Sequence, residues 1–151
     1  HDHPEGILAA QATAAAVFLA RTGAGKKDIA QYLHKEYGYP VKKPLALYRP
    51  FGKFDATAKG TMPLAIRCFL ESEDWESCIR NVFSVVCDTD TVACIAGGIA
   101  EAFYGGTGFD EDALLRRYLI KPNEQGVFDT FLYQWATKRP QDLEDGKGGS
   151  A

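Results

Sequence analysis

The segment Cys87–Gly106, CDTDTVACIAGGIAEAFYGG, places the strongest constraint on how this chain can fold. Four side chains that carry oxygen, Asp88 to Thr91, lead directly into an apolar segment rich in small residues. From Val92 to Tyr104 apolar residues occupy almost every side of a helix, which is typical of a helix buried on all sides. Its Ala and Gly residues keep the helix thin, so neighbouring backbones can approach closely. We therefore expect the fold to be built around this helix.

The acidic start of this segment is a candidate metal site. Side chains of an extended backbone repeat every second residue, so Asp88 and Asp90 can lean to the same side. Thr91 stands where the helix would begin, which brings its hydroxyl near the two carboxylates. Hard oxygen ligands of this kind suit Mg²⁺, Mn²⁺ or Ca²⁺ and not a soft metal. The sequence therefore offers Asp88, Asp90 and Thr91 as metal ligands.

Helix capping explains part of the same pattern without any metal. Asp and Thr are preferred N-cap residues, and acidic side chains are stabilised by the helix dipole at the N-terminus. An EF-hand loop is excluded, because Val92, Ala93 and Ile99 stand where that loop needs an oxygen ligand, a Gly and a bidentate Glu. Spacing alone leaves the cap and the metal site as alternatives.

Periodicity predicts an all-α fold, a compact multi-helix bundle without alternating strand patterns. Pro4 suits the first turn of a helix that continues from Ile7 to Arg21, whereas Pro and Gly keep Tyr39–Gly60 irregular. We expect a single all-α domain over residues 1–139 and a flexible polar tail over 140–151. The further predicted helices are Lys26–Tyr37, Thr61–Leu70, Asp74–Val86, Asp112–Leu119 and Glu124–Lys138.

Helical spacing also predicts which side chains face the core. On the first helix the expected apolar face is Ile7, Ala10, Ala14, Val17 and Phe18. On the helix that begins at Asp74 it is Trp75, Cys78, Ile79, Val82 and Phe83. In the irregular segment we expect three aromatic residues to pin the loop onto the core: Tyr48, Phe51 and Phe54.

Charge and cysteine usage exclude several classes of function. A net charge of −3 without a basic run argues against nucleic acid as the main partner, and no apolar run reaches the ~18 residues of a membrane span.

The cysteines show neither CxxC nor zinc-finger spacing, and Cys68, Cys78 and Cys94 fall in apolar helical patterns. We expect these three thiols to be buried and unpaired, as in a cytoplasmic protein. Cys87 borders the acidic cluster, where nearby carboxylates disfavour a reactive thiolate.

The sequence from about Gly60 to Gly105 resembles the C-terminal signature of the ADP-ribosylglycohydrolase family, GGD[ST]DTxAAIAGxIAxAYYG, preceded here by TMPLAI and DWESCIRN. The resemblance implies that Asp88, Asp90 and Thr91 hold a pair of divalent cations, usually Mg²⁺ (or Mn²⁺). HDHPEG at the start resembles a family segment that approaches the ADP-ribose pocket, which implies that His1 binds substrate. Val86 and Cys87 replace the two glycines that usually precede the signature, which leaves the backbone path into the site open to question.

The resemblance implies hydrolysis of the glycosidic bond between ADP-ribose and a protein side chain or small acceptor. Family members are longer, and their N-terminal part carries a catalytic acidic residue and a TDDT cluster, whereas this chain contains no Asp-Asp pair. The catalytic residue is therefore unknown. Because the chain opens with His, we expect an upstream segment or a partner chain to complete the site. Three hypotheses remain: a metal-dependent hydrolase, a binding module without turnover, and a structural domain with a capped helix.

Overall fold

The computed structural model describes residues 2–118, and these contain helices and no strand. The chain divides into two compact units, His1–Gly108 and Phe109–Ala151, which are described separately. In the first unit lie α1 (Pro4–Arg21), α2 (Lys26–Tyr37), two short 3₁₀ helices (Leu45–Leu47 and Arg49–Phe51), α3 (Ala58–Leu70), α4 (Trp75–Phe83) and α5 (Thr89–Tyr104). The second unit contains α6 (Glu111–Tyr118). The predicted all-α architecture is confirmed for the part of the chain that the structure describes.

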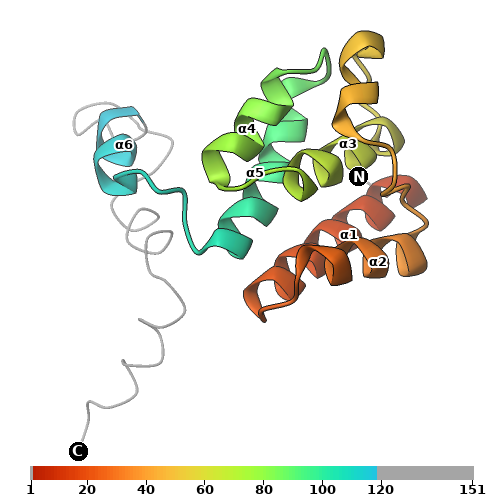
Figure 1. Cartoon of the computed structure of the whole chain (residues 1–151), viewed down its shortest axis with the longest axis horizontal. Helices are drawn as coiled ribbons and strands as arrows, with labels where there is room; N and C mark the ends of the chain where they lie inside the picture. Colours follow the sequence, from red (N-terminus) through yellow and green to blue (C-terminus); the bar gives the residue numbers. More distant parts are fainter. Residues whose placement is uncertain (1, 119–151) are drawn as a thin grey trace, which may run out of the picture. The chain divides into compact units, whose positions relative to one another are not determined.

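Helix α5 is the centre of the first unit, because α1, α3 and α4 all pack directly against it (Figure 1). Its inward residues are Val92, Ala96, Gly97, Ile99 and Ala100. The prediction that this helix is buried on all sides is wrong along one stripe, where Cys94 and Gly98 are exposed. Because the sequence is apolar on almost every side of this helix, it could not show which side of α5 no other helix covers.

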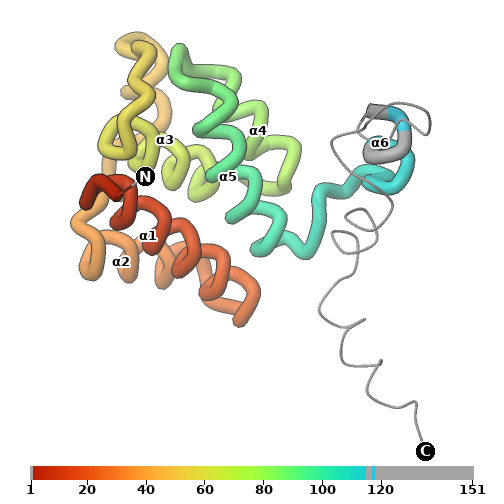
Figure 2. Tube along the Cα trace, turned by 180° about the vertical axis from the view of Figure 1, so that it is seen from behind, coloured from red at the N-terminus to blue at the C-terminus, as the bar shows by residue number. Residues whose placement is uncertain are grey.

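Helix α1 has the predicted length, but of the predicted apolar face only Val17 packs against the core. Its buried side chains are the alanines Ala12, Ala16 and Ala20, whereas Ile7 is 46% and Phe18 is 66% exposed. Alanine lets the axis of α1 come close to α2, α3 and α5, and these three helices contact α1. The tube in Figure 2 shows α1 running beside α2 and α5.

Helix α3 begins earlier than the sequence predicts. Thr57 is the N-cap and its hydroxyl accepts a hydrogen bond from the N–H of Gly60 at 3.1 Å. The predicted cap, Thr61, is already helical, and its hydroxyl donates to the carbonyl of Thr57 at 3.0 Å. The prediction failed because either Thr can cap a helix locally, and the turn that contains Asp55 makes Thr57 the available one.

Helix α4 begins as predicted after Asp74, whose carboxylate and Ser77 form a reciprocal capping box. It ends at Phe83, three residues before the predicted end at Val86, and Phe83 is exposed instead of facing the core.

Tyr48 packs against the core, but Phe51 and Phe54 are exposed, so two of the three aromatic anchors predicted for the irregular segment are wrong. Polar contacts hold this segment instead. Glu71 accepts a hydrogen bond from the N–H of Leu45 at 2.8 Å. The guanidinium of Arg67, which pairs with Glu71, donates a hydrogen bond to the carbonyl of Val41 at 3.1 Å.

All four cysteines are unpaired, as predicted. Cys68 and Cys78 are buried and Cys87 is half-buried, but Cys94 is exposed, which corrects the prediction of three buried thiols.

Helix α6 matches the predicted start near Asp112. The predicted helix Glu124–Lys138, the tail 140–151 and His1 lie outside the described residues. Within residues 2–118, no helix combines the length and apolarity that crossing a bilayer requires.

Candidate metal centre

The acidic cluster lies at the N-terminus of α5, the central helix. Asp88 occupies the N-cap position with φ −75° and ψ 82°, yet its side chain makes no capping hydrogen bond. Asp90, in the first turn, accepts a hydrogen bond from the backbone N–H of Thr91 at 3.0 Å. The capping alternative therefore accounts for one oxygen of Asp90 and leaves the carboxylate of Asp88 without a role in capping the helix.

The carboxyl group of Asp90 interacts with that of Asp88. That interaction is the main cause that holds the pKa of Asp90 below its ordinary value, and the backbone N–H groups of Thr91 and Asp90 add to it. Two carboxyl groups in such proximity repel each other when both are ionised. A cation bound between them would remove this repulsion, which is the physical reason that paired carboxylates suit a divalent ion.

The two threonines of the cluster point to different places. Thr89 is half-buried, and its hydroxyl donates to the carbonyl of Cys87 at 3.3 Å. Thr91 is exposed on the same helical turn as Asp90. The hydroxyl of Thr89 thus closes the turn before α5, whereas Thr91 stays at the surface with the acidic pair.

The backbone that leads into the cluster adopts conformations open to any residue. No non-glycine residue among those described has a positive φ, so Val86 and Cys87 occupy their positions without left-handed strain. The backbone at Val86 is closely approached by another segment of the chain, and the residue at the point of approach is a glycine, Gly52. A Cβ on Gly52 would lie 2.7 Å from the carbonyl oxygen and 2.8 Å from the nitrogen of Val86. Gly52 therefore lets the segment before α3 lie directly on the entry to α5.

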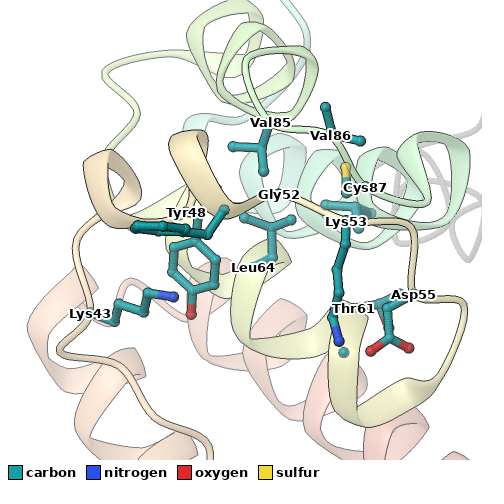
Figure 3. A pocket seen from close by; sticks show the side chains of 13 residues that line it. Lys43, Tyr48, Gly52, Lys53, Asp55, Thr61, Leu64, Val85, Val86 and Cys87 are labelled. Carbon is teal, nitrogen blue, oxygen red and sulfur yellow. The ribbon is translucent and has the colours of Figure 1, made fainter.

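A cavity of about 190 Å³ is lined by Cys87, the residue that precedes the acidic cluster (Figure 3). It is bounded by the segment before α3, by the start of α3 and by the turn that enters α5. Leu64, Val85 and Val92 give it an apolar floor, and Cys87, next to Asp88, is part of its wall. The volume suits a single ring or a sugar and is below the ~300 Å³ of a typical complete ligand pocket.

Charged groups line the ends of this cavity. Lys43 lies at one end with its ammonium 3.9 Å from the ring centre of Tyr48, and Lys53 lies at the other end with Asp55 (Figure 3). The carboxylate of Asp55 accepts hydrogen bonds from the N–H and hydroxyl of Thr57, and these bonds hold its pKa below the ordinary value. The cavity thus joins an apolar floor to a cationic end at Lys43 and to an end with opposite charges at Lys53 and Asp55.

Cys87 is poorly suited to act as a nucleophile, although it lines the cavity. Burial is the main cause that raises the pKa of its thiol, and the nearby carboxylate of Asp88 raises it further. The contact with Thr89 works in the opposite direction. A thiol with a raised pKa contains little of the reactive thiolate at neutral pH.

The donor set fits a hard cation in kind but not in number. Asp88, Asp90 and Thr91 provide carboxylate and hydroxyl oxygens, whereas an octahedral cation takes about six oxygen ligands. The described residues contain no group of three or more His, Cys, Asp or Glu side chains arranged to hold a metal. Water or further carboxylates would have to supply the remaining ligands.

Comparison with known proteins identifies the family of this chain. A family model described as ADP-ribosylglycohydrolase matches residues 1–125. The chain belongs to the ADP-ribosylglycohydrolase family. Neither a search of curated proteins nor a search of solved structures found a match. Membership in this family indicates a glycohydrolase-type hydrolase and agrees with the all-α fold.

In this member of the ADP-ribosylglycohydrolase family, the three residues that the sequence offers as metal ligands lie at the N-terminal end of α5. The other predicted site residue, His1, lies outside the described residues. Sequence reasoning missed the cavity: Gly52 and Gly60 counted only as helix breakers, and Lys43 and Lys53 were not singled out. A glycine close to a lysine in PFGKF was the available signal, because glycine often marks a close backbone approach.

Proposed function

We propose that this chain carries part of the active site of a metal-dependent ADP-ribosylglycohydrolase, which hydrolyses the glycosidic bond between ADP-ribose and a protein side chain or small acceptor. The observation that carries the proposal is the pair of carboxyl groups, Asp88 and Asp90, at the start of the central helix, where Asp88 makes no capping hydrogen bond. Neither group is buried in an ion pair with a basic residue of the described chain. Cys87, the residue before Asp88, lines a cavity, and this favours a role of the acidic pair toward a ligand.

In this proposal Asp88, Asp90 and Thr91 hold Mg²⁺ or Mn²⁺, with two ions in a complete site. A bound divalent cation would act as a Lewis acid and a template for the sugar hydroxyls. The chain's own residues position the substrate: the apolar floor of Leu64, Val85 and Val92 excludes water from one side of the cavity.

The cationic end of the cavity fits the charge of the proposed substrate. ADP-ribose carries a negatively charged diphosphate, and Lys43 would lower the free energy of that charge near the cavity. The cavity of about 190 Å³ accommodates one sugar or base at a time. We therefore expect most of the substrate to lie outside it, against residues that an upstream segment or a partner chain supplies.

The same segment or partner would also supply the missing metal ligands and the acid/base residue. Three oxygens from α5 leave about half of an octahedral shell to water. We therefore expect weak cation binding by this chain alone and stronger binding when further carboxylates are brought in.

The small donor set supports a second candidate, an ADP-ribose-binding module without turnover. A chain that holds a cation by three oxygens can retain ligand affinity while lacking the group that activates water. Release of ADP-ribose from an ADP-ribosylated protein distinguishes the two candidates, because only the hydrolase gives free ADP-ribose that depends on Mg²⁺ or Mn²⁺.

Isothermal titration with Mn²⁺ and with Mg²⁺ tests the metal site directly. The wild type should bind weakly, with a dissociation constant in the millimolar range, and Asp90→Asn should abolish the heat. Asp28→Asn is a matched control, since Asp28 is an exposed acid in the first turn of α2 with no carboxylate partner recorded in the structure. The titration is repeated on a longer chain that includes the upstream segment, where binding should tighten.

Equal heats for the wild type, Asp90→Asn and Asp28→Asn, in both the short and the longer chain, would refute the metal site. Cation binding without any release of ADP-ribose by the longer chain would refute the hydrolase and leave the binding module.

A further inference from the structure

Asp55 lines the cavity with one carboxylate oxygen occupied and the other free. Its Oδ1 accepts hydrogen bonds from the N–H of Thr57 at 3.0 Å and from the hydroxyl of Thr57 at 2.6 Å. None of the residues that the structure describes donates a hydrogen bond to Oδ2. An ionised carboxylate has about four acceptor sites, two on each oxygen, so the two sites of Oδ2 remain for a ligand.

The surroundings of Asp55 hold its carboxylate in one place. The hydrogen bonds from Thr57 are the main cause that keeps the pKa of Asp55 below its ordinary value, so the group is ionised at neutral pH. On the other side Gly60 makes room for the carboxylate, because a Cβ on Gly60 would overlap it. Asp55 is therefore a preformed hydrogen-bond acceptor, fixed between two residues at the start of α3.

The opposite end of the cavity suits an anion. The ammonium of Lys43 lies over the ring of Tyr48, and no carboxylate of the described chain forms an ion pair with it. The apolar floor suits the carbon face of a sugar ring. A volume of about 190 Å³ accommodates one pentose with its phosphate and leaves a nucleobase outside.

We propose that the cavity binds a ribose 5-phosphate unit, with the phosphate at Lys43 and the 2′- and 3′-hydroxyls donating hydrogen bonds to Oδ2 of Asp55. Two vicinal hydroxyls supply the two donors that Oδ2 can accept. Nucleotide-binding proteins of another fold use an acidic residue in the same way to bind a ribose hydroxyl. ADP-ribose contains two such units, and only its identity as the larger ligand rests on the proposed function.

Asp55 makes this site selective against a ribose that is phosphorylated on its 2′-oxygen. Such a phosphate removes one of the two donors and places negative charge beside the carboxylate. Asp55→Asn removes the charge of the side chain and keeps an oxygen that accepts from Thr57. It also leaves Lys53 at this end of the cavity to attract the phosphate, so the preference between the two ligands should reverse.

Titration of the ¹⁵N-labelled full chain, followed through the amide signals of residues 43–61, measures weak binding and locates it. The probes are AMP and adenosine 2′,5′-bisphosphate, in buffer without divalent cations. The wild type should bind AMP about tenfold more tightly than the bisphosphate, as expected for hydrogen bonds to a charged acceptor. Asp55→Asn should bind AMP about tenfold more weakly than the wild type and the bisphosphate more tightly. Asp28→Asn, the same change at an exposed position of α2, should leave both affinities unchanged.

Three further measurements separate the parts of the site. In the wild type, 2′-deoxyadenosine 5′-monophosphate should bind about tenfold more weakly than AMP, because one donor is missing. Gly60→Ala displaces the carboxylate without removing its charge and should also weaken AMP binding, whereas Gly98→Ala, at an open position, should not. Lys43→Gln should abolish the preference for AMP over adenosine, and Lys42→Gln at the exposed neighbouring position should retain it.

The wild type alone can overturn the proposal, through AMP that moves none of these amide signals at about 20 mM or through equal affinity for AMP and its 2′-deoxy form. An Asp55→Asn variant that retains the wild-type preference, or that binds both probes more weakly, would also overturn it, since a purely structural role predicts the second result. These affinities are measured without metal and without turnover. A longer chain that fails to release ADP-ribose would therefore refute the hydrolase and leave the ribose site standing.

Discussion

The two adjacent glycines of α5 differ in their surroundings, and this difference makes a quantitative prediction. A Cβ on Gly97 would lie 3.2 Å from Cδ1 of Ile79 and 3.6 Å from Nε1 of Trp75, whereas a Cβ on Gly98 would meet no atom within 4 Å. Gly97 also accepts a hydrogen bond from the indole N–H of Trp75 at 3.1 Å. The first glycine is a packing requirement, and the second is an exposed helix position.

Replacement of either glycine by Leu should gain about 0.8 kcal/mol of helix propensity. At Gly98 no packing cost opposes this gain, so Gly98→Leu should stabilise the protein by about 0.5–1 kcal/mol. At Gly97 the added side chain must displace Ile79 and Trp75, which costs about 1–3 kcal/mol by overpacking. Loss of the indole hydrogen bond costs about 1 kcal/mol more. The expected net effect of Gly97→Leu is a loss of roughly 1–3 kcal/mol.

Thermal unfolding and urea titration of the two variants measure the difference. For a unit of about 100 residues, 1 kcal/mol corresponds to ~4–8 °C in Tm. Gly97→Leu should therefore melt roughly 5–20 °C below the wild type, and Gly98→Leu a few degrees above it. A Gly97→Leu variant that melts with or above the wild type would refute the close packing of α5 on α4 and the central place of this helix.

Two further predictions concern a lysine and the thiols. Lys26 donates hydrogen bonds to the carbonyls of Leu70 and Ser72 and lies 5.2–5.6 Å from three aromatic ring centres. In urea titration, Lys26→Met should therefore destabilise the protein by about 2 kcal/mol, whereas Lys27→Met, at an exposed position, should change the stability little. Equal effects of the two variants would contradict this anchoring role. Without reductant, a thiol reagent should find four free thiols in the denatured chain and one fast thiol, Cys94, in the native chain, because burial raises the pKa of Cys78 to about 11 and that of Cys68 further. Fewer than four thiols on denaturation, or a fast phase that survives Cys94→Ser, would contradict the prediction.

The sequence by itself determined the helical class and most helix boundaries. Helix α2 matches its predicted bounds because Gly38, which ends it, takes φ 71°, a conformation that a residue without Cβ adopts freely. The capping box of Asp74 and Ser77 starts α4 through bonds within one turn. The candidate ligands Asp88, Asp90 and Thr91 were also found from local spacing and family resemblance. Information of this kind lies within a few residues and needs no tertiary contact.

Only the tertiary structure decided which sides of the helices are covered. Helix α1 is apolar around most of its circumference, so its sequence could not show that Ala12 and Ala16 would face the core and Phe18 would not. The cavity is likewise a tertiary property, because it depends on the fit of Gly52 against Val86, residues distant in the chain. Periodicity identifies a helix, but burial depends on the surfaces of the neighbouring helices and on the free energy of packing them together. That free energy is a sum over long-range contacts, which no local pattern contains.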